Sequence, residues 1–253
     1  MKIPYPRNGY YYCLDVLIDT KGENRLEVSL AHKNDSYAYK QISILSDELL
    51  DELKKYNNVQ FNWLDEKVIG IDKLPPNITK LEFYESYNFN QELNNLPINL
   101  KELTINLSNK YNYSFDYLPY GLEKLYLYLS INDNYDKPLN NLPPNLKTLH
   151  LALFVNDSFE ISFPQYLEDF RVGEDIDLNT LPDTITKLKI YQCNKKTITK
   201  LPKNLKHIEI SVENTQKKNI IDLVKKLEKS ENRSITFTEF KIGDYYIPEK
   251  CYH

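Results

Sequence analysis

Glycine and cysteine are scarce in this chain of 253 residues, which contains 6 Gly and 3 Cys. The few glycines form no Gly-rich loop of the kind that cradles phosphate, which argues against a nucleotide-binding loop. Cys13, Cys193 and Cys251 are odd in number, far apart and in no CxxC pair. This argues against a disulfide framework and favours a reducing compartment. Since the N-terminus has no apolar signal region and no run reaches membrane length, we expect a cytoplasmic protein without membrane contact.

Arginine is also scarce, and the formal net charge is −4. Most of the positive charge comes from Lys; Arg occurs at four positions, Arg7, Arg25, Arg171 and Arg233. Arginine is the side chain expected to bind phosphate or guanine in a bidentate manner. Without a basic surface, a nucleic-acid partner is not expected.

No pattern of catalytic or metal-ligating residues is found. The histidines His32, His150, His207 and His253 form no HExxH motif, and none has zinc-site spacing from a cysteine. His150 and His207 fall on one face of the predicted sheet, but two repeats separate them. We therefore expect no catalytic residue, no metal and no cofactor, and a protein that is not an enzyme. A hydrolase whose site assembles only in space is a distant alternative.

A repeat dominates the middle of the chain. Seven segments share the template Leu-Pro-x-x-Leu-x-x-Leu-x-Leu, with starts 22, 22, 24, 21, 18 and 20 residues apart. They are residues 74–83, 96–105, 118–127, 142–151, 163–172, 181–190 and 201–210. This length and this L-x-x-L-x-L core are typical of leucine-rich repeats. The sequence therefore predicts a leucine-rich-repeat solenoid with a parallel β-sheet on its concave side and turns or irregular segments on its convex side.

Each half of the template has a physical role. Leu-Pro-x-Asn predicts a type I turn with Pro at its second position and Asn at its fourth. The Leu-x-Leu that follows predicts a short strand whose alternate residues point inward. Stacked coils would then form two buried columns. The first is Leu81, Leu103, Leu125, Leu149, Phe170, Leu188 and Ile208, and the second is Phe83, Ile105, Leu127, Leu151, Val172, Ile190 and Ile210.

The segments that flank the repeats predict caps. Residues 46–61 predict a helix with Ser46 as N-cap, followed by a strand that starts a first coil. Residues 215–230 predict a second amphipathic helix, and a last strand follows at Ile235 to Phe237. Before residue 46, the segments 11–19, 25–30 and 37–44 predict an antiparallel meander.

We divide the chain into four regions on this basis. Residues 1–45 form a strand-rich cap, or alternatively a small separate domain, and residues 46–73 form the helix and strand of the first coil. Residues 74–211 carry the seven repeats, and residues 212–253 form a helix-strand cap.

The segment "NFNQELNNLPINL" resembles the FNIP repeat, a leucine-rich-repeat variant. Phe89, Asn90 and Gln91 match its F-N-q box, and residues 96–100 match its L-P-n-s-L turn. A looser copy of the box spans 135–139. The resemblance implies a protein of social amoebae or of giant viruses that infect amoebae, in the cytoplasm of the host if viral. Such repeats often follow an F-box that recruits a ubiquitin ligase, but residues 1–45 are predicted as strands rather than as the three helices of an F-box.

A surface remains as the candidate site. In leucine-rich-repeat geometry, the residues that flank the buried pair of each strand face the concave side, and Tyr and Arg are enriched at binding hot spots. We expect a protein partner to contact Tyr84, Tyr126, Tyr128, His150, Arg171, Lys189 and Tyr191. The alternative for any single tyrosine is simple stacking along an exposed sheet.

Three functions fit these observations. The preferred one is a non-enzymatic intracellular scaffold for protein–protein interaction. The second is a substrate adaptor of a ubiquitin ligase. The third is a viral structural or assembly protein that self-associates.

Overall fold

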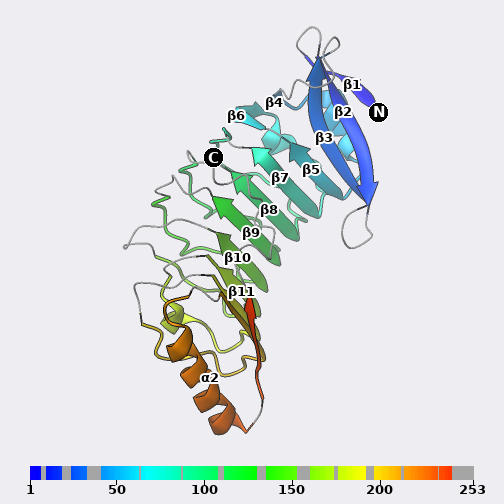
Figure 1. Ribbon diagram of the computed structural model, residues 1–253. Coiled ribbons are helices and arrows are strands. Elements are labelled where there is room, and N and C mark those ends of the chain that lie inside the picture. Colours follow the sequence, from blue (N-terminus) through cyan, green and yellow to red (C-terminus); the bar gives the residue numbers. More distant parts are fainter. Residues whose placement is uncertain are drawn as a thin grey trace.

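The structure is a computed structural model, shown in Figure 1. It describes residues 1–6, 10–18, 24–32, 41–62, 64–86, 88–107, 111–129, 135–152, 160–173, 176–191, 197–211, 214–232 and 234–240.

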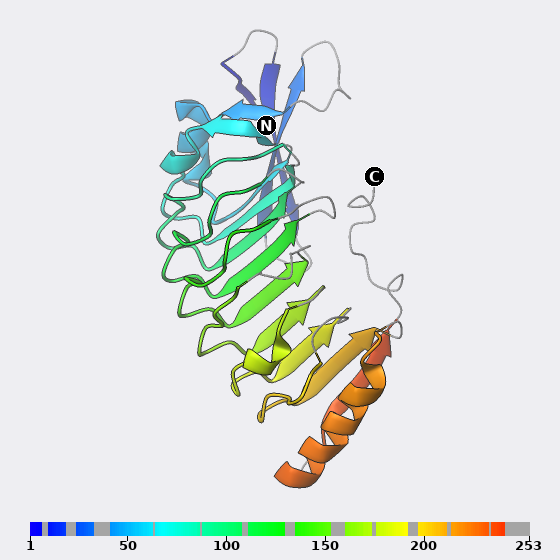
Figure 2. The same ribbon diagram turned by 90° about the vertical axis from the view of Figure 1, so that its left-hand side faces the viewer.

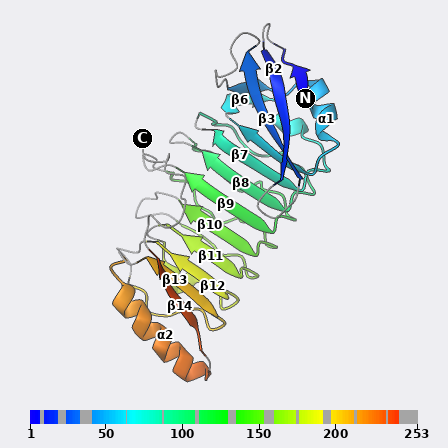
Figure 3. The same cartoon turned by 45° about the vertical axis from the view of Figure 1, so that its right-hand side comes forward.

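In the described part of the chain, one sheet of 12 strands runs from end to end, in the order β1-β2-β3-β5-β7-β8-β9-β10-β11-β12-β13-β14. Its strands are β1 (Lys2–Pro4), β2 (Tyr10–Ile18), β3 (Asn24–His32), β5 (Asn58–Asn62), β7 (Lys80–Ser86), β8 (Glu102–Leu107), β9 (Lys124–Leu129), β10 (Thr148–Ala152), β11 (Asp169–Val172), β12 (Lys187–Ile190), β13 (His207–Ser211) and β14 (Thr236–Phe240). From β3 to β14 all neighbours are parallel. Figures 1 and 3 show these strands stacked side by side, one for each coil. In Figure 2 the sheet lies along the inner side of a gentle arc and the turns along the other side. The predicted solenoid is confirmed.

The two predicted columns form the core of this solenoid. Leu103 pairs with Leu81 on one side and Leu125 on the other, and the same register continues through the repeats to Ile208. Every member of both columns is at most 2% exposed. Burial of a Leu, Ile or Phe side chain contributes about 1.5–3 kcal/mol, so the stacked coils supply the stability that no single coil has.

The Leu-Pro turns are shifted by one residue from the predicted position. In the second repeat the backbone N–H of Leu100 donates to the carbonyl of Pro97 (3.0 Å), so Pro97 is the first residue of the turn and not the second. Leu122 and Pro119 form the same bond at 3.0 Å, and corresponding bonds occur in all seven repeats. The physical reason is burial: Leu96 and Leu100 both point into the core, and the chain closes its turn between them.

This shift gives the turn asparagines a different role. Asn99 occupies the third position of its turn, and its side-chain amide donates to the carbonyl of Pro76 in the preceding coil (2.9 Å). Asn145 donates to the carbonyl of Tyr120 in the same way (3.3 Å). Asn at this position therefore satisfies a backbone carbonyl of the neighbouring coil and joins the turns to one another.

Aromatic rings form a second contact between coils. Phe89, the Phe of the F-N-Q box, is 1% exposed and lies 5.5 Å from the ring of Phe83 and 6.3 Å from that of Tyr111. Tyr111 stacks on Phe115 at 5.1 Å, and Phe115 contacts Tyr135 at 5.7 Å. The box residue thus belongs to a continuous buried aromatic ladder that crosses several coils.

Helices lie near both ends of the solenoid (Figure 1). Helix α1 (Asp47–Leu53) begins at Ser46, whose side chain accepts a hydrogen bond from the N–H of Leu49. Helix α2 (Lys217–Glu231) buries Ile220 and Val224. Two 3-10 helices, η1 (Ile71–Lys73) and η2 (Leu178–Thr180), lie in the connecting segments. No helix in the described ranges is both long and apolar enough to cross a membrane.

The N-terminal strands extend the solenoid sheet. Strands β1, β2 and β3 pair antiparallel, and β3 then pairs parallel with β5. The prediction of a third antiparallel strand over residues 37–44 is wrong in its pairing. Residues 33–40 lie outside the described ranges, while β4 (Ile42–Ile44) pairs parallel with β6 (Leu64–Ile69) in a separate two-stranded sheet.

Two buried tyrosines anchor β4 to the meander. The hydroxyl of Tyr5 shares a hydrogen bond with Ser43 (2.8 Å), and the hydroxyl of Tyr12 donates to the carbonyl of Ile44. Burial raises the pKa of Tyr12 to about 12, so the hydroxyl remains a donor at neutral pH. Residues 42–44, in the third predicted segment, are therefore extended as expected, but these long-range bonds decide their strand partner.

Candidate binding face

Three rows of outward-pointing residues cover the inner side of the sheet in the repeats, and we name this surface the concave face. The first row is Lys80, Glu102, Lys124, Thr148, Asp169, Lys187 and His207. The middle row is Glu82, Thr104, Tyr126, His150, Arg171, Lys189 and Glu209. The last row is Tyr84, Asn106, Tyr128, Ala152, Gly173, Tyr191 and Ser211. Because side chains alternate along a strand, these residues point away from the two buried columns.

Four of the predicted site residues form one cluster. Tyr126, His150 and Arg171 are register partners on β9, β10 and β11, and Tyr128 is two residues further along β9. The rings of Tyr126 and His150 meet edge to face at 4.6 Å. Since neighbouring strands are about 4.8 Å apart, Tyr126 and Arg171 are separated by only about 10 Å at the backbone.

His150 is the most buried member of this cluster, with 8% of its surface exposed. Its Nε2 atom lies 3.7 Å from Oδ1 of Asp169, which is too long for a hydrogen bond, and it has no hydrogen-bond partner in the described part of the chain. Burial lowers the pKa of His150, and the nearby Asp169 carboxylate offsets this only in part. The imidazole is therefore neutral at physiological pH.

Arg171 is the exposed cation of the cluster. Its side chain is 44% exposed, and its Nε atom lies 3.7 Å from the same Asp169 oxygen. Burial raises the pKa of Tyr128 to about 12, with a further contribution from Tyr191, while the charge of Arg171 opposes the shift. Burial also raises the pKa of Tyr126, and Arg171 again opposes it. Both hydroxyls therefore stay protonated, and the guanidinium is close enough to act on each of them.

Lys189 is buried below the surface of the concave face and is held in an ion pair. The side chain is only 4% exposed, and its Nζ atom lies 2.9 Å from Oε2 of Glu209. The ammonium also stands 4.2 Å above the ring of Phe240 and 5.3 Å from that of Tyr191. Burial raises the pKa of Glu209, but hydrogen bonds from Lys189 and His207 outweigh it and leave the pKa below its ordinary value. Lys189 was expected to contact a partner, yet the structure holds it in an internal ion pair.

Tyr84 lies apart from this cluster. Strand β8 separates it from β9, and Asn106, in the same row of β8, is 3% exposed. The middle-row neighbour of Tyr84 is Glu82, whose carboxylate lies 3.6 Å from Arg25. Burial raises the pKa of Glu82. The structure thus divides the predicted site into a central cluster and a separate end that includes Tyr84.

Charges on the concave face largely neutralise one another. In the first row, Nζ of Lys124 lies 3.1 Å from Oε2 of Glu102. Asp169 faces Arg171, and Glu209 pairs with Lys189, so each acid on these strands has a cation beside it. Each half-exposed ion pair of this kind adds little stability. Together these pairs prevent a large region of positive or negative electrostatic potential on the concave face.

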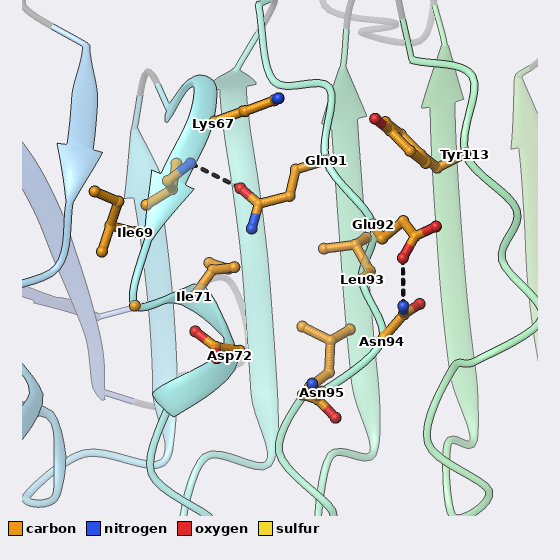
Figure 4. A pocket seen from close by; sticks show the side chains of 13 residues that line it. Lys67, Ile69, Ile71, Asp72, Gln91, Glu92, Leu93, Asn94, Asn95 and Tyr113 are labelled. Atoms are coloured by element: carbon orange, nitrogen blue, oxygen red, sulfur yellow. Dashed lines mark hydrogen bonds between the residues drawn. The ribbon is translucent and has the colours of Figure 1, made fainter.

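A pocket that the sequence analysis did not predict lies outside the concave face (Figure 4). It has a volume of about 650 Å³ and is lined by residues 67–72, 91–96 and Tyr113. Gln91 stands in its wall, where its side-chain Oε1 accepts a hydrogen bond from the N–H of Val68 (2.7 Å). Asn94 donates to Glu92 at 2.5 Å. The side chain of Gln91 thus accepts the hydrogen bond from a backbone N–H of β6 that a neighbouring strand would otherwise accept. This role depends on residues 23 positions apart, so no local pattern predicts it.

The described residues contain no group of three or more His, Cys, Asp or Glu side chains that could hold a metal ion. Cys13 is a free thiol, and burial raises its pKa. Cys193 and Cys251 lie outside the described ranges.

Comparison with known proteins agrees with the fold. Residues 67–108 match the FNIP Repeat family model, which confirms the resemblance over the segment that carries the F-N-Q box. The same fold occurs in the crystal structure of CroV588, a giant-virus protein described as a novel circular LRR protein structure. The TM-score is 0.51 at 20% sequence identity, and the match covers 89% of this chain and 34% of that one. This chain thus spans about a third of its structural neighbour. No curated protein sequence matches it.

Proposed function

We propose that this chain is a non-enzymatic scaffold that binds a protein partner through the concave face. One observation carries the proposal: Tyr126, Tyr128, His150 and Arg171 form a single patch on three adjacent strands whose backbones the repeat holds in register. Tyr and Arg provide large contact areas, and such residues concentrate the energy of interfaces. A rigid sheet presents them with little loss of conformational entropy on binding.

The chemistry of the patch favours a protein over a polyanion. Nucleic acids bind through many cations that neutralise successive phosphates. On the concave face, Lys124 and Lys189 are already paired with Glu102 and Glu209. A partner that brings mixed apolar and polar groups suits this surface better. The scarcity of cysteine and the free thiol of Cys13 are consistent with a cytoplasmic setting.

Affinity purification tests the proposal. The tagged chain would be incubated with amoebal lysate, since repeats of this kind are known from amoebae and their viruses. Replacing Tyr126, Tyr128 and Arg171 together with Ala should lower recovery of the specific partner at least tenfold, because each truncation at a hot spot costs about 1–4 kcal/mol and a tenfold loss needs only about 1.4. The melting temperature and circular dichroism spectrum should stay close to those of the wild type.

The matched control removes two tyrosines from the turn side, Tyr117 and Tyr120, which are 64% and 70% exposed. This double Ala variant should recover the partner as well as the wild type does. Loss of the partner in the control and retention in the concave triple variant would place the binding surface on the turns.

Affinity purification and light scattering separate the two alternatives, a ubiquitin-ligase adaptor and a self-associating viral protein. Ligase subunits among the recovered proteins would identify a ubiquitin-ligase adaptor. Light scattering that shows oligomers of the purified chain at micromolar concentration would support self-association.

A further inference from the structure

Three polar side chains at the centre of the concave face, Tyr126, Tyr128 and Arg171, carry hydrogen-bond donors that lack an acceptor among the described residues. The hydroxyls of Tyr126 and Tyr128 form no hydrogen bond with any described residue, although their raised pKa values keep them protonated. Arg171 touches Asp169 through Nε alone, at 3.7 Å, which leaves both terminal guanidinium nitrogens without an acceptor among the described residues. These side chains come from neighbouring register positions of β9 and β11, and the charge of Arg171 acts on both tyrosine hydroxyls.

His150 provides a second, independent observation. It lies between Tyr126 and Arg171 in the middle row, is 8% exposed, and its Nε2 atom has no hydrogen-bond partner in the described segments. A buried polar nitrogen without a partner costs about 1–3 kcal/mol. An acceptor that binds beside Arg171 would offset this cost.

We propose that Arg171, Tyr126, Tyr128 and His150 form a receptor for a single carboxylate, the side chain of an Asp or Glu residue of the protein partner. This inference rests on the proposed function and names the anchor group that the concave face takes. The two terminal nitrogens of Arg171 form the fork that matches a carboxylate in a bidentate manner. The tyrosine hydroxyls are placed to donate to the outer lone pairs of the same group.

The local charge favours a carboxylate over a phosphate. Asp169 stands 3.7 Å from both Arg171 and His150, so one negative charge is already present at the site. Lys189, the next cation in the row, is engaged by Glu209 at 2.9 Å. A dianion would therefore bring two further negative charges to a site with one exposed guanidinium and one carboxylate, whereas a monoanion brings one and meets less repulsion from Asp169.

The row beside the receptor leaves room for the chain that carries this carboxylate. Ala152 and Gly173 follow Tyr128 in the last row, and a Cβ added to Gly173 would already contact Cα of Ala152 at 3.4 Å. Because Ala152 and Gly173 have almost no side chain, the surface next to Tyr128 is low. A larger side chain at position 173 would occupy the space that we assign to the partner's backbone.

The test uses the scarcity of arginine. In the full-length chain labelled with ¹⁵N, the side-chain Nε signals come from only four arginines, and an Arg171→Lys variant assigns the signal of Arg171. The probe is the peptide acetyl-Gly-Leu-Glu-Leu-Gly-amide, titrated at pH 7. We expect a saturable shift at Arg171 and none at Arg25, which is already paired with Glu27 at 2.6 Å and serves as an internal control.

Two further peptides and one variant complete the experiment. The isosteric Gln peptide should bind at least tenfold more weakly, and a phosphoserine peptide should bind no more tightly than the Glu peptide. A Tyr126→Phe, Tyr128→Phe variant, which keeps both rings, should weaken the Glu peptide about tenfold without lowering the melting temperature.

Equal shifts with the Glu and Gln peptides, no shift at Arg171, or tighter binding of the phosphoserine peptide would each overturn the carboxylate receptor. If one of these peptide results is obtained while the concave triple variant still loses its protein partner, the carboxylate receptor is wrong but the concave face remains the binding surface. If the triple variant keeps its partner, the proposed function itself fails.

Discussion

Replacing Leu125 with Asp is expected to unfold the centre of the solenoid. Leu125 is fully buried, with Leu103 and Leu149 beside it in the first column. An unpaired carboxylate at this point loses its hydration and finds no donor, so the change should cost on the order of 3–5 kcal/mol or more. In a chain of this size, about 1 kcal/mol corresponds to about 2–4 °C in melting temperature, so the melting temperature should fall by about 6–20 °C.

The matched control is Thr104→Asp, in the middle row of the adjacent strand. Thr104 is half-buried on the concave face, and its register partner Glu82 would repel the new charge only weakly. We expect a loss below about 1 kcal/mol. Equal melting temperatures for the two variants would mean that the faces of the strands are assigned the wrong way round.

Replacing Phe89 with Ala should have the second largest effect. The ring is 1% exposed and contacts both Phe83 and Tyr111, so its loss opens a cavity in the middle of the aromatic ladder. Buried Phe→Ala changes cost about 3–5 kcal/mol. Chemical denaturation should therefore show a much lower midpoint. Phe89→Leu, which keeps most of the volume, should restore a large part of the loss.

An exposed aromatic residue provides the control for this prediction. Tyr120 is 70% exposed on the turn side, and its replacement by Ala should change the free energy of unfolding by less than about 0.5 kcal/mol. If Phe89→Ala were equally harmless, the F-N-Q box would not form part of the core.

The buried columns could be predicted because they depend only on local spacing. Leu125 and Leu127 alternate with Tyr126, and the same alternation returns once per coil, which defines the inner and outer faces without any knowledge of distant contacts. The N-cap at Ser46 is similarly local, since the residue and its hydrogen-bond donor Leu49 are three positions apart.

The turn frame could not be predicted from residue preferences alone. Pro97 and Asn99 suit either of two turns that differ by one residue. The observed choice depends on two non-local facts: Leu96 and Leu100 must both be buried, and the Asn99 amide must reach the carbonyl of Pro76. The pairing of β4 with β6 is non-local in the same way, because Tyr5 and Tyr12 fix β4 from a distant part of the chain.

The sequence predicts which residues of the candidate site lie on the concave side of the sheet, but it does not predict how buried or how paired each of them is. Tyr126, Tyr128 and Arg171 lie on the surface as expected, whereas Lys189 is buried. Its burial depends on the ring of Phe240, which the last strand brings to the face. Spacing gives the side of the sheet on which a residue lies, and tertiary neighbours decide whether it remains exposed.

Site-specific photo-crosslinking tests the central claim, that partners bind the concave face, most directly. A photoreactive amino acid would replace Thr104, which is the register partner of Tyr126, in one variant and Tyr120 on the turn side in another. Each variant would be irradiated with the recovered partner and analysed by mass spectrometry. We predict a crosslinked product from position 104 and none from position 120. A product from position 120 alone would contradict the account and place the partner on the turns.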